Sequence, residues 1–295
     1  MTGEGTAVLL VSHGTVDDLA DLPAFVTNVR HGHAPSAELV AELRRRYEAV
    51  GGSPLNAINE RLAAALAARL GVRVSNANRL WKPYVKDVLA QLKRDGAKRV
   101  AVVPLAQHSA PVYEADARRA AEGTGLAIVC AANWGQRPAL LDAYARRIGD
   151  ALQGAIGATV VMTAHSLPRA IVDRGDPYER EVRAAAAGIA ERLGPSVRWT
   201  VAFQSQGMDS GAGAWLGPDL PTTFDELAAR GDRGVVVAPI GFLADHVETL
   251  YDLDIEAAAL ARSRGLQWAR ARSLDDGADL VDVLADVARE LLSRG

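Results

Sequence analysis

The sequence has little cysteine, no long apolar run and no excess of one charge. Its 295 residues include a single cysteine, Cys130, which excludes an internal disulfide framework, a four-thiolate iron–sulfur cluster and a cysteine-based zinc finger. No stretch of about 20 apolar residues occurs, so we expect no membrane span. The first residues carry no basic region, and the apolar run 7–11 is too short for a signal peptide. These features favour a cytoplasmic protein.

Neither the charge nor the short motifs support nucleic-acid or nucleotide binding. The chain has 33 basic and 36 acidic residues, a net charge of −3, which argues against a whole-surface nucleic-acid binder. A Walker A sequence and a GxGxxG turn are both missing. Ser166 does not stand in a GxSxG nucleophile elbow, and Cys130 closes an apolar run typical of a core strand. With 49% hydrophobic and 23% charged residues, the composition is that of a globular protein.

Short β-branched runs alternate along the chain with segments of helical spacing. This alternation predicts βαβ units and a doubly wound α/β fold, because continuous apolar runs suit strands that are buried on both faces of a parallel sheet. The expected strands are 7–11, 99–103, 159–162, 197–202 and 234–238. The expected helices are 37–50, 56–70, 84–95, 138–152, 178–193 and 281–292.

The segment AVLLVSHGT near the start is similar to TVVMTAHSLP in the middle of the chain. In each, an apolar strand ends at a histidine, His13 or His165, that is followed by a small residue. The similarity indicates two related halves, which we place at 1–135 and 136–295, with a C-terminal helix that can pack back on the first half. A chance match of two short segments is the alternative.

Four of the six histidines directly follow expected strands: His13, His108, His165 and His246. Ligands of doubly wound folds bind beyond the carboxyl ends of the strands, so we expect these side chains to border a small-molecule site. Imidazole is both a ligand for divalent transition metals and an acid or base near neutral pH. Taken one at a time, each could equally be a polar loop residue.

Glu248, Asp252 and Glu256 are spaced by four residues and would form one acidic stripe on a helix. The stripe could pass a hydrated cation or protons toward His246 and its neighbours. A solvated helix face is the simpler interpretation, since acidic residues also favour the first turn of a helix.

Four blocks, in order, resemble the ferrochelatase family, whose members insert ferrous iron into a porphyrin. TAHSLPRAIVDRGDPYERE (163–181) and PIGFLADHVETLYDLDIE (239–256) resemble its two signatures, and RRRYEAVGGSPLN (44–56) and QSQGMDSGAGAWLGPD (204–219) resemble two further blocks. NVRHGH (28–33) and LAQHS (105–109) are most similar to the soluble bacterial type that acts on coproporphyrin III. The resemblance implies two similar doubly wound, Rossmann-like domains of the chelatase type, each a parallel four-stranded sheet flanked by helices.

The resemblance also implies roles for individual residues. His165 and Glu248 would be catalytic and would bind the metal together with His13, while Asp252 and Glu256 would relay metal or protons. The porphyrin-contacting positions fall on His13, Arg30, Arg46, Tyr47, Ser53, Tyr113 and Trp215. Arginine suits the four propionates of coproporphyrin, and aromatic side chains suit the macrocycle.

One departure from the family pattern keeps other functions open. The coproporphyrin-type enzymes usually carry tyrosine at the position of His13, and VSHGT also resembles the opening of the small sirohydrochlorin chelatases, whose early histidine binds metal. A sirohydrochlorin cobalt or iron chelatase is therefore one alternative, and a non-catalytic tetrapyrrole or metal carrier is another. Protoporphyrin IX is the second candidate porphyrin.

The expected partners follow from the same resemblance. They are the porphyrin and Fe²⁺, both substrates, and we expect no tightly bound cofactor and no iron–sulfur cluster, given the single Cys130. We further expect a monomer that meets an iron donor and a haem acceptor transiently.

Overall fold

The chain divides into two compact units in the computed structural model, which describes residues 5–206 and 215–294. Unit 1 comprises Met1–Trp134 together with Asp275–Gly295, and unit 2 comprises Gly135–Leu274. The sequence placed the boundary at 135, with a C-terminal helix that can pack back on the first half; in the structure the division falls after Trp134, and Asp275–Gly295 belong to the first unit.

Unit 1 is built on a parallel sheet that has four strands among the described residues, in the order β2-β1-β3-β4. The residues of β1 from Ala7 to Val11 are at most 2% exposed, as expected for a central strand covered on both faces. The strands are β1 (Thr6–Ser12), β2 (Arg73–Asn78), β3 (Arg99–Pro104) and β4 (Ala127–Cys130).

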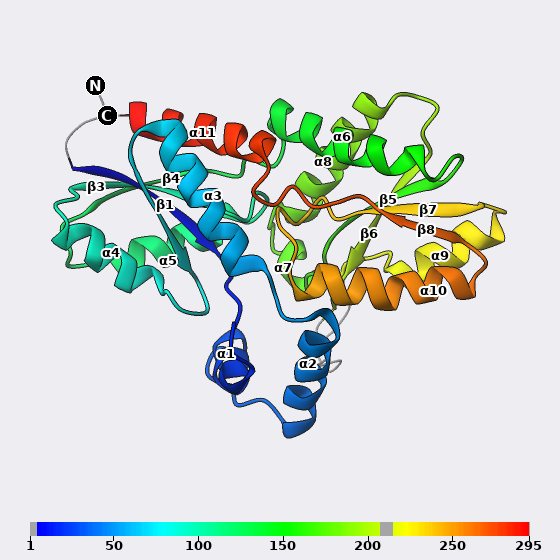
Figure 1. Ribbon diagram of the computed structural model, residues 1–295, viewed down its shortest axis with the longest axis horizontal. Coiled ribbons are helices and arrows are strands. Elements are labelled where there is room, and N and C mark those ends of the chain that lie inside the picture. Colours follow the sequence, from blue (N-terminus) through cyan, green and yellow to red (C-terminus); the bar gives the residue numbers. More distant parts are fainter. Residues whose placement is uncertain (1–4, 207–214, 295) are drawn as a thin grey trace. The chain divides into compact units, whose positions relative to one another are not determined.

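Helices cover both faces of this sheet (Figure 1). The apolar sides of α4 and α5 pack with Leu9, Val11 and Val102 into one core cluster, while α3 and α11 pack together over β2 and β3. Arg99 of β3 donates to the carbonyl oxygens of Leu291 and Leu292 at 2.8 and 3.2 Å, which satisfies acceptors left open at the end of α11. The helices are η1 (Leu19–Asp21), α1 (Leu22–Val29), α2 (Ala37–Val50), α3 (Leu55–Leu70), α4 (Val85–Arg94), α5 (Ala110–Ala121) and α11 (Ala278–Ser293).

Unit 2 repeats the strand order of unit 1. Its sheet, again of four parallel strands in the described part of the chain, has the order β6-β5-β7-β8, so that β1 and β5 are equivalent, as are β3 and β7. The strands are β5 (Thr159–His165), β6 (Trp199–Gln204), β7 (Gly234–Ala238) and β8 (Gln267–Arg270). The expectation of two similar parallel four-stranded α/β domains is confirmed.

Two groups of helices flank the sheet of unit 2 (Figure 1). The apolar sides of α9 and of the continuous segment η2–α10 pack on β5, β6 and β7 around Phe224 and Leu253, and α6 and α8 pack against each other. The helices are α6 (Pro138–Gln153), α7 (Arg169–Asp173), α8 (Tyr178–Leu193), α9 (Leu220–Ala229), η2 (Glu248–Ala257) and α10 (Ala258–Ser263). Among the described residues, no helix combines the length and apolar character that crossing a membrane requires.

The segment η2 is a π-helix rather than the regular helix expected for the acidic stripe. A π-helix has a wider turn, with hydrogen bonds from residue i to i+5, and such turns are frequent at functional sites. Its first residue is Glu248.

Candidate active site

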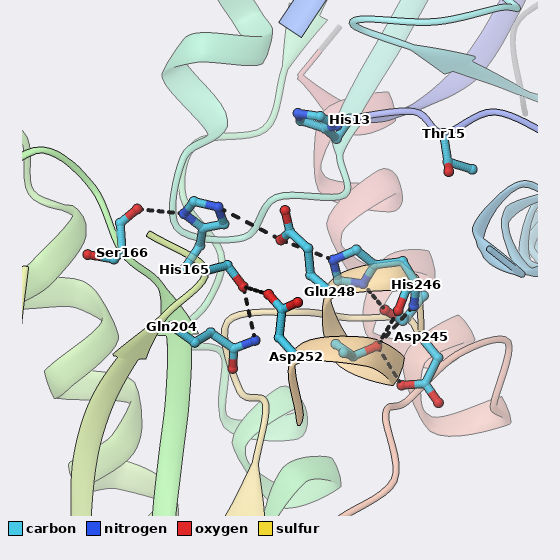
Figure 2. Close-up of polar contacts among 12 residues, drawn as sticks. His13, Thr15, His165, Ser166, Gln204, Asp245, His246, Glu248 and Asp252 are labelled. Atoms are coloured by element: carbon cyan, nitrogen blue, oxygen red, sulfur yellow. Dashed lines mark hydrogen bonds and ion pairs between the residues drawn. The ribbon is translucent and has the colours of Figure 1, made fainter. Parts of the chain in front are cut away.

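His165 is the last residue of β5, and its surroundings fix the orientation of its ring (Figure 2). The hydroxyl of Tyr178 donates to the His165 carbonyl oxygen at 3.0 Å, and the fully buried Ser166 donates its N–H to Gln204 and its hydroxyl to Leu216. The His165 Nδ1 atom lies within hydrogen-bonding distance of the Ser166 carbonyl oxygen. A carbonyl oxygen only accepts, so this contact assigns a proton to Nδ1 and leaves Nε2 as the nitrogen that can gain or lose a proton.

Glu248 lies beside this lone pair and beside a second imidazole. Its Oε2 atom is 3.8 Å from His165 Nε2 and 3.5 Å from His246 Nε2. The side chains of His165 and Glu248 are 36% and 37% exposed, so that solutes can reach both. The ring of Phe242 lies near both imidazoles, with centroid distances of 6.5 Å to His165 and 4.8 Å to His246.

The ring of His246 has the same orientation as that of His165, with Nδ1 at a backbone carbonyl oxygen and Nε2 toward Glu248. His246 Nδ1 is 3.1 Å from the carbonyl oxygen of Ala244, which leaves Nε2 directed at Glu248. Burial opposes charge on this ring, but the contact with Glu248 and the negative charge of that carboxylate outweigh burial and raise the pKa of His246. The described residues contain no group of three or more histidine, cysteine, aspartate or glutamate side chains close enough to hold a metal ion.

A half-buried polar cluster lies next to the start of η2. Asp245 accepts from Arg270 Nη1 and Nη2 at 2.9 and 3.1 Å and from the Ser273 hydroxyl at 2.6 Å. Burial works against the Asp245 carboxylate, but the contacts with Arg270 and the hydroxyls outweigh it and lower its pKa. Burial raises the pKa of Asp254, which shares the same guanidinium.

The two further acidic residues of the expected relay differ in their surroundings. Asp252 accepts a hydrogen bond of 2.6 Å from the hydroxyl of Ser205 (Figure 2), a residue in the left-handed region with φ +56°. Glu256 is exposed near the end of η2. Along the π-helix, the predicted stripe thus includes Asp252, which is hydrogen-bonded to the residue after β6, and Glu256, which is exposed.

In unit 1, His13 follows β1 at the position equivalent to that of His165. The His13 ring is exposed and lies edge-on to Phe25, with the centroids 6.2 Å apart. Gly14 adopts φ +99°, and a Cβ atom there would lie 2.9 Å from the Cβ atom of Asn78, so only glycine fits next to this histidine. Phe25, Trp81 and Tyr84 continue as a row of edge-to-face rings.

Other porphyrin-contacting candidates of unit 1 belong to α1, α2 and the turn after α2. Arg30 follows α1 and is half-buried. Arg46 donates to Glu42 at 2.8 Å, and the hydrogen bonds from Arg45 and Arg46 lower the pKa of Glu42 to about 2. Tyr47 is 3% exposed and shares a 2.8 Å hydrogen bond with Thr15. The buried Oγ atom of Ser53 meets no hydrogen-bonding partner among the described residues.

The last two candidates differ in their surroundings. Tyr113 of α5 packs in the core cluster of unit 1, with the Arg79 guanidinium 5.9 Å from its ring centroid, and burial raises its pKa to about 12. Trp215 of unit 2 pairs with Pro168 in an isolated bridge. Residues 207–214 of the block that precedes Trp215 lie outside the described residues.

The structure thus brings His165 and Glu248 together and adds three side chains to which the sequence assigned no catalytic, metal-binding or porphyrin-binding role. His246 lies beside the Glu248 carboxylate, Phe242 packs against the two imidazoles, and Arg270 donates to Asp245. His246 follows an apolar strand, and Phe242 and His246 both lie in the block 239–256 quoted from the sequence, whereas Arg270 lies outside every such block. Arg270 and Asp245 are 25 residues apart in the chain, so no local spacing predicts their contact.

The fold and the pair of imidazoles around one carboxylate define an α/β protein of the chelatase type. A solved structure described as "SirB from Bacillus subtilis with Fe3+" matches with a TM-score of 0.64 and covers 98% of this chain and 96% of its own. Its identity of 16% limits this likeness to the fold.

The sequence comparisons identify the family. The ferrochelatase family model matches residues 5–292. A protein named ferrochelatase from Herpetosiphon aurantiacus is 37% identical over 96% of this chain and 97% of its own length. A coproporphyrin III ferrochelatase from Anoxybacillus flavithermus is 32% identical over 97% and 96%. The chain belongs to the ferrochelatase family and is accordingly a metal chelatase of the lyase class.

Proposed function

We propose that the enzyme inserts Fe²⁺ into coproporphyrin III in haem biosynthesis. The observation that carries the proposal is the His165 ring, whose Nε2 atom lies 3.8 Å from Glu248 Oε2 in a solvent-accessible position. The relative named coproporphyrin III ferrochelatase, at 32% identity over nearly the whole chain, favours this porphyrin. Protoporphyrin IX is the second candidate.

Insertion has to remove two protons from the macrocycle. Fe²⁺ forms bonds to four pyrrole nitrogens, and two of these nitrogens lose their N–H protons, so one neutral porphyrin and one Fe²⁺ give the iron porphyrin and two protons. In the proposal, His165 Nε2 receives a proton or holds the incoming Fe²⁺, since one lone pair serves either task. Glu248 stabilises the resulting positive charge, and Asp252 and Glu256 pass protons or cations onward. His13 of unit 1 is the further metal ligand in this proposal.

The porphyrin carboxylates require cationic partners, which the proposal assigns to unit 1. Arg30 and Arg46 bind the propionates, because guanidinium groups bind carboxylates through two parallel hydrogen bonds. Tyr47, Ser53 and Tyr113, with Trp215 of unit 2, contact the macrocycle or its substituents. Arg46→Ala should therefore weaken the porphyrin affinity, measured as the Kd from the Soret absorption, and an unchanged Kd would remove Arg46 from this role.

His165→Ala tests the central assignment. The variant should lose Fe²⁺ insertion under anaerobic conditions while its porphyrin Kd stays near that of the wild type, and added imidazole should restore part of the rate by occupying the vacated space. Near-normal insertion by the variant would contradict the proposal.

Glu248→Gln provides a second test with a matched control. The substitution keeps the size of the side chain and removes the negative charge beside the two imidazoles, so kcat should fall more than porphyrin affinity. Glu226→Gln makes the same chemical change at an exposed position of α9 in unit 2 and should leave both quantities unchanged. Equal effects of the two substitutions would mean that Glu248 has no special role.

One substrate panel separates the alternatives. The wild type is offered Fe²⁺ or Co²⁺ with coproporphyrin III, protoporphyrin IX or sirohydrochlorin, at protein concentrations far below those of the substrates. Multiple turnovers with Fe²⁺ and coproporphyrin III support the proposal, and a preference for sirohydrochlorin would make the enzyme a sirohydrochlorin cobalt or iron chelatase. A single stoichiometric binding event would indicate a tetrapyrrole or metal carrier.

The proposal includes no resident cofactor. Fe²⁺ acts as a substrate, and an iron–sulfur cluster would need more thiolates than the single Cys130 provides. In the same proposal, the enzyme is a monomer. It receives iron from a transient donor and passes its product to a transient haem acceptor.

A further inference from the structure

Arg270 contacts two carboxylates that flank Glu248 in the sequence. It is the last residue of β8, and its side chain is 12% exposed. Its Nη1 and Nη2 atoms donate to the two oxygens of Asp245, which precedes Glu248, at 2.9 and 3.1 Å. Its Nε atom donates to Asp254, which follows Glu248 within η2, at 2.7 Å. One guanidinium therefore joins the end of a sheet strand to both sides of the segment that carries Glu248.

The contacts continue from Asp245 to the backbone of the active-site residues. The hydroxyl of Thr249, which is fully buried, is 3.1 Å from Asp245 Oδ1 and 2.9 Å from the carbonyl oxygen of His246. The same hydroxyl accepts the backbone N–H of His246 at 2.9 Å. Within the described part of the chain, the residue that precedes η2, Val247, makes no side-chain capping bond. The start of the π-helix is thus held by Thr249 and Asp245.

Glu248 approaches the two imidazoles from the first residue of this attached segment. The distances of 3.8 and 3.5 Å from Glu248 Oε2 to His165 and His246 exceed a hydrogen bond, so these contacts fix the carboxylate only weakly. A displacement of about 1 Å far from the chemistry can reduce a rate by roughly 10²-fold.

We propose that Arg270 is a positioning residue of the insertion reaction: by holding Asp245 and Asp254 at the end of β8, it sets the place of Glu248 between His165 and His246. The inference rests on the proposed function for its kinetic part only. The role requires arginine, because the planar guanidinium serves two carboxylates at once, whereas an ammonium group is a compact point charge without that geometry.

Arg270→Lys keeps the positive charge and removes the planar guanidinium that donates to two carboxylates at once. The variant should lower kcat for Fe²⁺ insertion about 10- to 100-fold, with the porphyrin Kd within twofold of the wild type. The matched control is Arg264→Lys, since Arg264 follows α10 in the same unit and its Nε atom donates to Asp225 at 2.9 Å. The control should keep kcat and Kd within twofold. A kcat of the Arg270 variant within twofold of the control would overturn the inference, as would equal losses of kcat and porphyrin affinity.

A second measurement does not depend on the reaction. The ¹⁵N chemical shifts of the His165 and His246 rings should change in Arg270→Lys and should stay constant in Arg264→Lys. Asp254→Asn, which removes one of the two carboxylate charges and is the milder variant, should shift the same signals and lower kcat less than Arg270→Lys. Unchanged ring signals in both variants would overturn the inference. If the wild type inserts no Fe²⁺, the proposed function fails, whereas the ring signals still decide whether Arg270 positions this site.

Discussion

Gly241→Ala would test how closely the chain packs behind His165. Gly241 follows β7, and its N–H donates to the Thr163 carbonyl oxygen at 2.9 Å. A Cβ atom at this position would lie 2.6 Å from both the Cα and Cβ atoms of Ala164, the neighbour of His165 in β5. Non-bonded carbon atoms keep about 3.5–4.0 Å apart, so the two segments have to separate by about 1 Å.

That separation predicts two measurable effects. Overpacking of this kind costs roughly 1–3 kcal/mol of stability, which lowers the thermal midpoint of the chain. A shift of about 1 Å in β5 moves His165 relative to Glu248, and the expected loss in kcat for Fe²⁺ insertion is on the order of 10²-fold. Initial rates are measured anaerobically, at a temperature where wild type and variant are both fully folded.

The control for this prediction is Gly149→Ala on α6 of the same unit. A Cβ atom at Gly149 meets no described atom within 4 Å, so the substitution should keep kcat and stabilise the helix by about 1 kcal/mol. If Gly241→Ala retains a kcat within twofold of the control, the packing argument is refuted.

Three further predictions concern buried groups of unit 1. Burial lowers the pKa of His108 to about 4, so between pH 6.5 and 4 the unfolded chain binds a proton that the folded chain does not. About 3 kcal/mol of stability present above pH 6.5 should therefore be lost as the pH falls to about 4. Urea unfolding should show this loss in the wild type and not in His108→Gln. Tyr47→Phe removes the 2.8 Å hydrogen bond to Thr15 and should cost about 1–2 kcal/mol in the same assay; no cost would mean that the bond adds nothing. Burial raises the pKa of the Cys130 thiol to about 12, so Ellman's reagent should label it at pH 8 only after denaturation.

The central strands were predictable because their residues are apolar without interruption. The run expected at 234–238 matches β7, and that at 7–11 lies within β1. Among the four edge strands, β6 was predicted at 197–202, whereas β2 and β8 were not, since RVSNAN and QWAR are short, partly exposed and largely polar. A strand at the edge of a sheet is defined by its neighbour's hydrogen bonds more than by its own apolar pattern.

The active-site pair was predictable from local blocks, whereas its support was not. His165 and Glu248 stand in long segments with the family's pattern, and the structure places them 3.8 Å apart. The contacts of Arg270 connect residues that are 16 and 25 positions apart, and such distances leave no periodic trace. The π-helical turn that begins at Glu248 was also missed, because the four-residue spacing of the acidic residues fits an ordinary helix equally well.

Because α11 belongs to unit 1, the unit whose synthesis begins first is completed after unit 2. Unit 2 has all its residues once Leu274 has left the ribosome, whereas unit 1 still lacks the helix that packs on α3 and receives the side chain of Arg99. The N-terminal unit, which carries His13, is therefore the last to be completed. A stop codon or a bulky fusion near residue 275 would therefore disturb the packing of unit 1, although most of unit 1 is translated before unit 2.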